Sequence, residues 1–250
     1  MLVTGAARRI GAVIARRLAR DGHRVVLHHF HSAEEAEALT AELRGAGAQV
    51  SLIHGDISAD PDRLFADARA SAGGMIEGLV NCASLFDFDR PPHEKPDLFA
   101  SMMRTNLAGP VALATALARQ EGLIEGAVVN VLDQKVANLN PDFFSYSLSK
   151  TALDSATVML AQALSPRVRV NAVSPGLTMT SHDQSAQEFD AVARDNLLRR
   201  AVSADDIAGT VAFLLNCASI TGQNVFVDCG QRFVTRDSDV MFATRERALD

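Results

Sequence analysis

Cysteine is scarce in this 250-residue chain, and its few thiols are poorly placed for cross-linking or metal binding. The three cysteines, Cys82, Cys217 and Cys229, form no Cys-x-x-Cys pair, and their odd number is a poor basis for a disulfide framework. Because no second cluster of Cys, His or Asp has metal-ligand spacing, we expect no bound metal. This cysteine usage fits a reducing compartment best, and we expect a cytoplasmic protein.

Long apolar runs and an excess of basic residues are also missing. No run approaches the length of a membrane span, and the first residues lack the basic and apolar regions of a secretory signal, so we expect neither a membrane anchor nor export. The net charge of −6 argues against a nucleic acid as partner, since proteins that bind a phosphate backbone usually carry a basic face. With 48% hydrophobic and 22% charged residues, the chain is expected to be globular with a large core.

Short β-rich apolar runs alternate along the chain with longer segments of helical spacing. Ile10, Ile14 and Leu18, for example, recur at helical intervals, as on the buried stripe of a helix. The alternation predicts an α/β protein: a single-domain, doubly wound Rossmann fold over residues 1–250, whose seven-stranded parallel sheet is flanked by helices on both faces. The predicted strands cover residues 2–4, 24–28, 50–54, 78–81, 127–132, 167–173 and 224–228.

In such a sheet, ligands bind in the crevice beyond the carboxyl ends of the strands. Residues 87–96 fit no predicted element, and we expect them to flank a substrate pocket there. The segment at about 177–200 is predicted to cover that pocket. The polar tail at 232–250 is predicted either to lie over a neighbouring subunit or to be frayed.

The first predicted strand leads into a turn, Thr4-Gly5-Ala6-Ala7-Arg8-Arg9-Ile10-Gly11, that opens a helix. Backbone N–H groups and the positive end of a helix attract a pyrophosphate, and glycines let the backbone approach it closely. The residues expected to bind a dinucleotide here are Gly5, Arg9, Ile10 and Gly11. The turn has Ala7 where Gly-x-Gly-x-x-Gly would place a glycine, so an ordinary strand-to-helix turn is the alternative.

The end of the second predicted strand reads His28-His29-Phe30-His31-Ser32 and contains no acid. An NAD-preferring site usually places a carboxylate here, to accept a hydrogen bond from the ribose 2′-hydroxyl. Hydrogen-bond donors and positive charge favour a 2′-phosphate instead, so NADP(H) is the expected cofactor. The candidate contacts are Arg9, His28, His31 and Ser32. A solvated loop is the alternative, for His29 in particular.

Tyr146 is the only tyrosine of the chain, whereas there are twelve phenylalanines. Lys150 follows four residues later, so on a helix the two side chains share one face. A free phenol has a pKa of about 10, and a neighbouring ammonium lowers it toward the range in which a general acid works efficiently. Lys150 also has the reach to donate to a cofactor ribose. A packing tyrosine beside a solvated lysine is the alternative, which the scarcity of tyrosine disfavours.

These motifs form an ordered series that resembles the short-chain dehydrogenase/reductase (SDR) family over nearly the whole chain. The matching positions are Thr4 to Gly11, Asp56, Asn81-Cys82-Ala83-Ser84, Asn106, Tyr146-x-x-x-Lys150, Pro175-Gly176 and Asp228-Cys229-Gly230. The resemblance implies an NAD(P)H-dependent oxidoreductase that forms a homotetramer. The small-residue run 151–163 suits close packing between helices in such an assembly.

The resemblance also implies roles for single residues. The expected cofactor contacts outside the first turn are Asp56 and Ile57 at the adenine, Asn81, Cys82 and Ala83 behind the adenosine ribose, and Pro175 and Gly176 beside the nicotinamide. Tyr146 and Lys150 would contact the cofactor as well. Asn106 would anchor a water relay behind Lys150.

The family usually has a serine about thirteen residues before the tyrosine, whereas this chain has Asp133. A carboxylate there would repel the developing oxyanion of a ketone, but it accepts hydrogen bonds from the N–H groups of an electron-poor heterocycle or passes on a proton. The replacement resembles the pteridine reductase and dihydromonapterin reductase branch. By that resemblance Phe86 would stack on a pterin, with Ser84 and Arg9 at its polar edge. The alternative is that Phe86 packs as part of a lid and Phe88 stacks.

The sequence therefore predicts an NADPH-dependent oxidoreductase that transfers a hydride to a pterin-like substrate. The expected catalytic residues are Asn106, Asp133, Tyr146 and Lys150, and the expected substrate contacts are Ser84, Phe86, Asp133 and Tyr146. One alternative is a carbonyl reductase or alcohol dehydrogenase of the same family, in which Asp133 is a tolerated polar substituent. Another is a catalytically silent nucleotide-binding regulator, against which the intact Tyr146 and Lys150 argue.

Overall fold

A parallel β-sheet forms the centre of the molecule. The computed structural model describes residues 1–180 and 185–242. The strands within this part are β1 (Leu2–Val3), β2 (Val25–His29), β3 (Val50–His54), β4 (Gly78–Asn81), β5 (Gly126–Val131), β6 (Val168–Pro175) and β7 (Asn224–Val227). They form one seven-stranded sheet in the order β3-β2-β1-β4-β5-β6-β7, with every neighbouring pair parallel. The predicted doubly wound sheet is confirmed.

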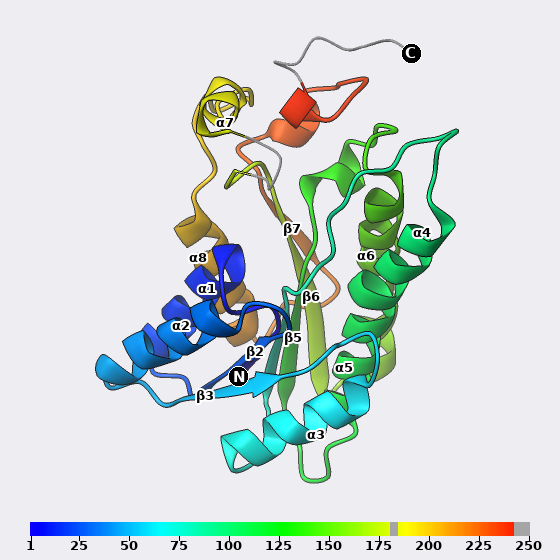
Figure 1. Ribbon diagram of the computed structural model, residues 1–250. Coiled ribbons are helices and arrows are strands. Elements are labelled where there is room, and N and C mark those ends of the chain that lie inside the picture. Colours follow the sequence, from blue (N-terminus) through cyan, green and yellow to red (C-terminus); the bar gives the residue numbers. More distant parts are fainter. Residues whose placement is uncertain (181–184, 243–250) are drawn as a thin grey trace.

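Helices cover both faces of the sheet (Figure 1). On one face lie α1 (Arg9–Arg20), α2 (Ala33–Gly45) and α8 (Ala204–Asn216), and on the other lie α3 (Pro61–Ala72), α5 (Gly109–Ala118) and α6 (Phe144–Leu164). α4 (Pro96–Met102) continues into α5 through a π-helical turn, η1 (Met103–Ala108), while α7 (Ala186–Val192) stands beyond the sheet. The 3-10 turns are η2 (Gln134–Ala137), η3 (Gln231–Phe233) and η4 (Val240–Phe242). In the described part of the chain, no helix has the length and apolar character needed to cross a membrane.

The strands contribute side chains to two cores, because alternate residues of a strand point to opposite faces of the sheet. Leu2 packs in the core beneath α3 and α5, whereas the next residue, Val3, packs in the core beneath α1 and α8. The predicted helical stripe lies in this second core: Ile14 and Leu18 are fully buried, and Ile10 packs against them from the edge. The helical interpretation of this spacing is confirmed.

The strand boundaries differ from the prediction by one residue at most, except in β6. β6 extends to Pro175, which pairs with Val227 of β7, so it ends two residues beyond the predicted end at residue 173. Proline has no N–H to donate, so it is disfavoured inside a central strand but tolerated at the last position of one. The following N–H, of Gly176, donates to the Val227 carbonyl at 3.0 Å and completes the pairing.

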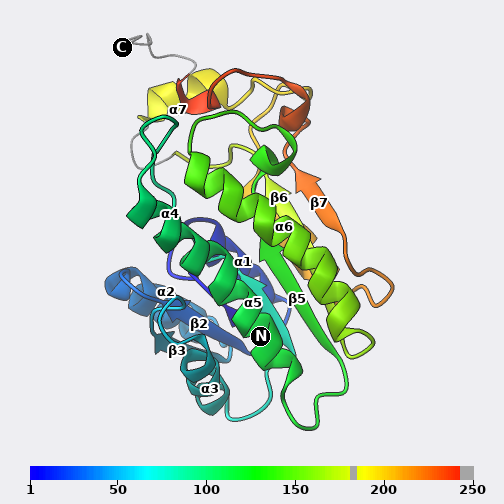
Figure 2. The same ribbon diagram turned by 90° about the vertical axis from the view of Figure 1, so that its right-hand side faces the viewer.

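The segments that follow β4, β5, β6 and β7 gather at one end of the molecule, beyond the carboxyl ends of the strands (Figures 1 and 2). Asn138, after β5, donates to the Val234 carbonyl at 3.0 Å. The Leu177 N–H, after β6, donates to Gln231 Oε1 at 2.7 Å. These long-range bonds join segments that are distant in the sequence into one rim around the strand ends.

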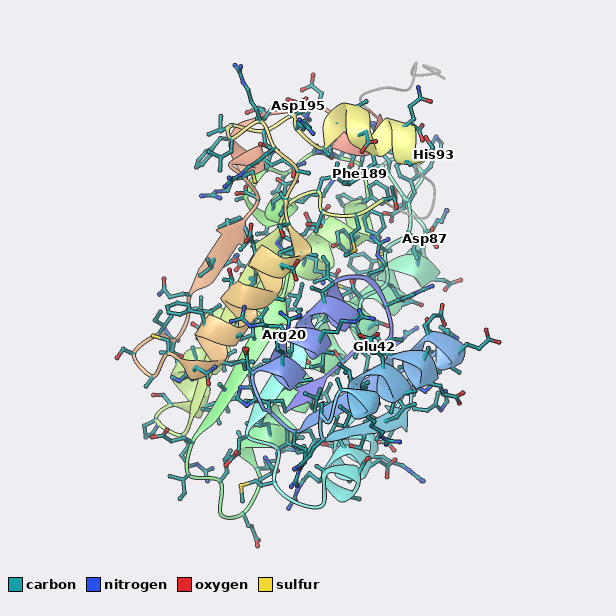
Figure 3. The ribbon with its side chains drawn as sticks, turned by 90° about the vertical axis from the view of Figure 1, so that its left-hand side faces the viewer. Arg20, Glu42, Asp87, His93, Phe189 and Asp195 are labelled. Carbon is teal, nitrogen blue, oxygen red and sulfur yellow. The ribbon has the colours of Figure 1, made fainter. Side chains whose placement is uncertain are left out.

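The segments predicted to flank or cover a pocket lie at this end. Figure 3 shows Asp87 and His93, from the segment after β4, at the same end of the molecule as Phe189 on α7. The predicted cover at about 177–200 includes α7, and its residues 181–184 lie outside the described part of the chain. That it covers a substrate stays a prediction.

The described part of the tail, residues 232–242, packs against its own chain. Arg236 forms an ion pair with Asp195, and Asp239 forms one with Lys135 at 2.7 Å. A frayed tail is therefore wrong for these residues, because ion pairs to two other segments of the chain hold them in place. Contact with a neighbouring subunit stays a prediction, and the remaining tail residues lie outside the described part of the chain.

Candidate active site

The turn after β1 is fixed to the end of β4 by a threonine hydroxyl. Thr4 Oγ1 donates to the Val80 carbonyl at 3.3 Å and accepts from the N–H groups of Cys82 and Ala83 at 3.0 and 3.1 Å. The two central strands of the sheet thus end side by side, and residues 82 and 83 lie directly beside the turn. Their predicted place behind a cofactor ribose is consistent with this geometry and stays a prediction.

Two glycines let the turn approach the start of α1 closely. Gly5 has a φ of +62°, and a Cβ on it would lie 2.8 Å from Ala83 Cα. A Cβ on Gly11 would lie 2.2 Å from the Gly5 carbonyl oxygen. No side chain fits at either position, and Ala7, where a glycine is more usual, is buried away from the turn's outer surface. Because the first N–H groups of a helix have no partner within the helix, this cradle fits the pyrophosphate of a dinucleotide.

His28 connects this turn to the end of β3. The Gly5 N–H donates to His28 Nδ1 at 3.2 Å, and the partners assign the ring proton to Nε2, which donates to the Gly55 carbonyl at 2.9 Å. Burial lowers the pKa of His28 to about 4, so the ring is neutral. Since both ring nitrogens are engaged by the backbone, the predicted contact with a 2′-phosphate is corrected: His28 acts on the cofactor turn through Gly5.

Arg9 begins α1 in a left-handed conformation, with a φ of 55°. Its guanidinium donates to the Thr180 carbonyl, and burial lowers the pKa of Arg9 while the nearby Cys82 and Tyr146 side chains raise it. That Arg9 lies at the polar edge of a substrate stays a prediction. Recognition of a 2′-phosphate by Arg9, His31 and Ser32 stays a prediction. The His31 ring is exposed, with its centroid 4.0 Å from that of Phe30.

The adenine end of the predicted nucleotide site lies after β3 and β4. Asp56 Oδ1 accepts from the Ser58 N–H at 2.8 Å, and Ile57 is 3% exposed. Contact of these residues with an adenine stays a prediction. Asn81 Nδ2 donates to Asn130 Oδ1 at 2.9 Å, so its amide joins β4 to β5 inside the sheet. The place of Asn81 behind an adenosine ribose stays a prediction.

The predicted catalytic side chains come together on one face of α6 and at the end of β5. Tyr146 and Lys150 are both buried, and Tyr146 Oη donates to Asp133 Oδ2 at 3.0 Å. Lys150 Nζ donates to the Val131 carbonyl at 2.8 Å and lies 5.7 Å from the centroid of the Tyr146 ring. The four-residue spacing places both side chains in one environment, as predicted.

The direction of the tyrosine pKa shift is opposite to the prediction. Burial, and then the neighbouring Asp133 carboxylate, raise the pKa of Tyr146 well above its ordinary value. The expected lowering by Lys150 is therefore wrong in this structure, because the lysine is held by a backbone carbonyl while the carboxylate contacts the phenol directly. Burial lowers the pKa of Lys150 to about 8 and raises that of Asp133. The phenol thus keeps its proton, as a donor must.

Asn106 lies in the π-helical turn η1 and clamps the segment after β4 to α6. Its Nδ2 donates to the Leu85 carbonyl and to Ser149 Oγ, each at 3.0 Å. Its Oδ1 accepts from the Leu85 N–H at 2.8 Å and from Ser84 Oγ at 3.2 Å. An asparagine amide has capacity for about four such bonds. These bonds clamp the segment after β4 to α6, and the anchoring of a water relay behind Lys150 stays a prediction.

A row of aromatic rings borders the Tyr146 hydroxyl. Phe86 stacks on Phe143 with ring centroids 4.3 Å apart, and it meets Tyr146 edge-to-face at 4.7 Å. Phe88 contacts Phe143 and Phe242 instead, at 5.3 and 5.5 Å. Of the two candidate stackers, Phe86 is the one beside the catalytic tyrosine, and it is 43% exposed. Phe143 was not predicted, and only its position next to Phe144 at the start of α6 links it to the motif.

Pro175 and Gly176 end β6 beside the turn that follows β7. A Cβ on Gly176 would lie 2.7 Å from Gln231 Oε1 and 2.9 Å from Asp228 Cα, so this approach requires a glycine. Asp228 is buried and accepts from the Gly230 N–H at 3.0 Å. These contacts fix the end of β6 against the turn after β7, and the place of Pro175 and Gly176 beside a nicotinamide stays a prediction. Among the described residues, no three His, Cys, Asp or Glu side chains gather as metal ligands.

The first turn of the parallel sheet suits a pyrophosphate, and the end of β5 and α6 present Asp133, Tyr146 and Lys150. Together these features define an oxidoreductase of the SDR type. A family model described as enoyl-(acyl carrier protein) reductase matches residues 5–232, and the chain belongs to this family of short-chain dehydrogenases/reductases. The resemblance drawn from the sequence motifs is confirmed.

Relatives within the family act on different substrates. A crystal structure of FolM alternative dihydrofolate reductase 1 from Brucella suis in complex with NADP is 38% identical, covers 94% of this chain and 95% of its own, and superposes with a TM-score of 0.91. Dihydromonapterin reductase of Enterobacter sp. is 27% identical over 92% of this chain and 95% of its own length. The 3-oxoacyl-[acyl-carrier-protein] reductase FabG of Staphylococcus epidermidis is 29% identical over 92% of this chain and 97% of its own.

Proposed function

We propose that this oxidoreductase uses NADPH to reduce a pterin-like substrate of the dihydropterin, dihydrofolate or dihydromonapterin type. The predicted cofactor, NADP(H), is confirmed by similar structures that contain NADP or NADPH. The observation that carries the substrate proposal is the hydrogen bond from Tyr146 to Asp133. A carboxylate at this position accepts from N–H groups but does not favour a developing oxyanion.

NADPH, when bound, supplies the hydride. Reduction of a carbon–nitrogen double bond also needs a proton at the nitrogen, and Tyr146, with its raised pKa, holds one at the site. The proton that Tyr146 gives up is replaced from solvent, and Asp133, whose pKa burial also raises, is placed to pass that proton to the phenolate. Lys150, whose ammonium lies 5.7 Å from the centroid of the Tyr146 ring, would hold the cofactor ribose beside the phenol.

The rim beside Tyr146 suits a flat heterocycle. The exposed Phe86 offers a ring next to the phenol, and aromatic groups stack favourably on flat rings. Arg9, which donates to the Thr180 carbonyl, carries donors suited to the carbonyl and ring-nitrogen acceptors of a pterin. Relatives that reduce dihydrofolate and dihydromonapterin support this choice of substrate class.

The test is to follow NADPH oxidation with dihydrobiopterin, with dihydrofolate and with a panel of ketones. We expect turnover with a pterin and not with ketones, and we expect Asp133→Ser to reduce kcat/KM for the pterin at least tenfold, since general acid–base groups contribute about 10²-fold to 10⁴-fold. Unchanged pterin kinetics in Asp133→Ser would remove the reason for choosing this substrate class.

Carbonyl reduction is the second candidate, because FabG of Staphylococcus epidermidis matches nearly its whole length to this chain. Turnover with ketones alone, and faster turnover in Asp133→Ser, are the results that would favour it, since a serine hydroxyl donates to an oxyanion. NADPH binding without turnover of any substrate would favour a silent regulator.

A further inference from the structure

A buried ammonium group lies behind Asp133 and belongs to none of the SDR motifs. The chain has three lysines, Lys95, Lys135 and Lys150. Lys150 is part of the catalytic centre and Lys95 is exposed, whereas Lys135, on η2, is 3% exposed. Burying a charge is costly unless it is paired and hydrogen-bonded. The buried ammonium of Lys135 therefore needs a charged partner and hydrogen-bond acceptors.

Lys135 holds two aspartates at once. Its backbone N–H donates to Asp133 Oδ1 at 2.9 Å, while the other oxygen of that carboxylate accepts from Tyr146. Its ammonium forms an ion pair with Asp239 Oδ2 at 2.7 Å, with side-chain exposures of 4% and 11%, and donates to Asn140 Oδ1 at 3.0 Å. One residue thus links the proton-donating pair to a carboxylate that lies 104 positions away in the sequence.

Asp239 belongs to a C-terminal closing segment, residues 239–242, that is tied down at several points. The Asp239 N–H donates to Asp142 Oδ2 at 2.8 Å, and Asp142, itself buried, pairs with Arg90 at 2.7 Å. The ring of Phe242 lies parallel to that of Phe143, with centroids 5.9 Å apart. The closing segment therefore joins the same rim that carries Phe86 and the predicted substrate pocket.

We propose that the Lys135–Asp239 ion pair is a positioning element for catalysis: it holds Asp133 against Tyr146, and its two charges set how readily this pair gives up a proton. The inference rests on the proposed role of Asp133. It makes docking of the closing segment a condition for the full rate.

The two charges act on Asp133 in opposite directions. After burial, which raises the pKa of Asp133, the hydrogen bond from the Lys135 N–H and the Lys135 charge lower it, and the Asp239 charge raises it. The other titratable groups that face Asp133 are Tyr146 and Lys150, both from α6. Removing the Lys135 charge therefore raises the pKa of Asp133, and removing the Asp239 charge lowers it.

The experiment measures the pH dependence of kcat for Lys135→Met and Asp239→Asn with the substrate that the wild type reduces. Reduction needs a protonated donor, so the rate falls on the alkaline side. We expect this fall to move to higher pH in Lys135→Met and to lower pH in Asp239→Asn, by roughly one pH unit each, with kcat reduced about tenfold. A purely structural role would slow both variants without shifting the two profiles in opposite directions.

Three further variants make the result decisive. Lys135→Arg keeps the charge and should stay within a few-fold of the wild type, and Arg63→Met removes an exposed cation from α3, away from the predicted site, and should change nothing. The double variant Lys135→Met/Asp239→Leu removes both charges of the pair, so neither is left buried without the other, and this favours folding where a single variant fails. We expect from it NADPH affinity within a few-fold of the wild type and turnover about tenfold slower.

The proposal is overturned if the double variant turns over at the wild-type rate, or if folded single variants show unshifted pH profiles. These results are independent of the substrate class. Should the wild type reduce ketones and not pterins, the proposed function fails, and the same variants measured with a ketone still decide whether the ion pair positions Asp133.

Discussion

At the scale of single residues, the chemistry of the site depends on which groups hold protons. The phenol of Tyr146 is buried against a carboxylate and keeps its proton, while Lys150 is held by the Val131 carbonyl. Delivery of the proton therefore requires a substrate nitrogen basic enough, or a developing charge large enough, to draw it from the Tyr146–Asp133 pair.

Tyr146→Phe removes that proton while keeping the ring. We expect kcat for reduction to fall by about 10²-fold to 10⁴-fold, the usual contribution of a general acid. We expect the Kd for NADPH to stay within a few-fold of the wild type, because the phenol acts on the substrate. Steady-state kinetics and a fluorescence titration with NADPH measure the two quantities.

Ser147→Ala is the matched control, because it removes a buried hydroxyl from the same turn of α6. Ser147 Oγ makes no hydrogen bond within the described part of the chain, so its loss should change neither kcat nor Kd appreciably. An equal loss of NADPH binding in Tyr146→Phe would contradict the assigned role of Tyr146.

The buried, neutral His28 leads us to expect that the folded protein loses stability in acid. The pKa of His28 is lowered by burial from its ordinary value of 6.5 to about 4 in the folded protein. Between these two pH values the imidazole of His28 is protonated in the unfolded chain and neutral in the folded one. The neutral, buried His28 therefore favours the folded state in full above about pH 6.5, and this stabilisation is lost as the pH falls toward 4. The free energy of unfolding should change by about 3 kcal/mol over this range. Denaturant unfolding across this pH range measures it.

The matched variants are His28→Gln and His31→Gln, since His31 is exposed. We expect the free energy of unfolding to vary less steeply with pH in His28→Gln than in the wild type, and equally steeply in His31→Gln. His28→Gln should also weaken NADPH binding, because the Gly5 N–H loses its partner. A wild-type pH dependence in His28→Gln would show that His28 is not the buried neutral group described here.

At the scale of elements, α6 depends on a residue from a different part of the chain for its start. Phe143, which precedes α6, has a φ of 54°, and its side chain forms no cap. The buried Asp89, after β4, instead accepts from the Ser145 N–H at 2.9 Å and from Ser145 Oγ, while its carbonyl accepts from the Phe144 N–H at 3.2 Å. Its negative charge also suits the positive end of a helix.

Asp89→Ala should therefore weaken both the fold and the site. It leaves the buried N–H and hydroxyl of Ser145 without their partner, which costs about 1–3 kcal/mol of unfolding free energy. Because Tyr146 is the next residue, kcat should fall as well. Asp87→Ala is the control, since Asp87 is exposed and accepts from the adjacent Phe88 N–H. Thermal denaturation and kinetics that do not distinguish the two variants would contradict the capping role.

Several elements were predictable because their signals are local. The stripe Ile10, Ile14 and Leu18 and the alternation of apolar runs predicted α1 and the parallel strands, with most strand ends within one residue of the structure. The π-helical turn around Asn106 and the long-range cap on α6 were not predictable. Both depend on contacts between segments that no local pattern records.

At the scale of the whole molecule, α6 carries apolar side chains that its own chain leaves exposed. Leu148, Val158 and Met159 are 40%, 44% and 67% exposed. Such side chains on a regular helix suit an interface between subunits. We therefore expect a homotetramer in solution and expect Met159→Glu to form smaller species, measured by sedimentation velocity.

Ile124→Glu is the control for this prediction, because Ile124 is 84% exposed but lies in the connection between α5 and β5. It should leave the assembly unchanged. A monomeric wild type would show that the tetramer prediction is wrong, and a tetrameric Met159→Glu would show that α6 is not at the interface.

The amino-acid sequence alone determined which side chains share a face and which turn can hold a phosphate. The four-residue spacing of Tyr146 and Lys150 places them on one side of a helix, and the glycines of the first turn allow a close backbone approach, because helix geometry and steric exclusion act locally. Only the tertiary structure decided that the phenol contacts Asp133, that His28 holds Gly5, and that Lys135 meets Asp239. Burial and pairing between distant segments set these contacts and the pKa shifts that follow from them, and neither is encoded in local spacing.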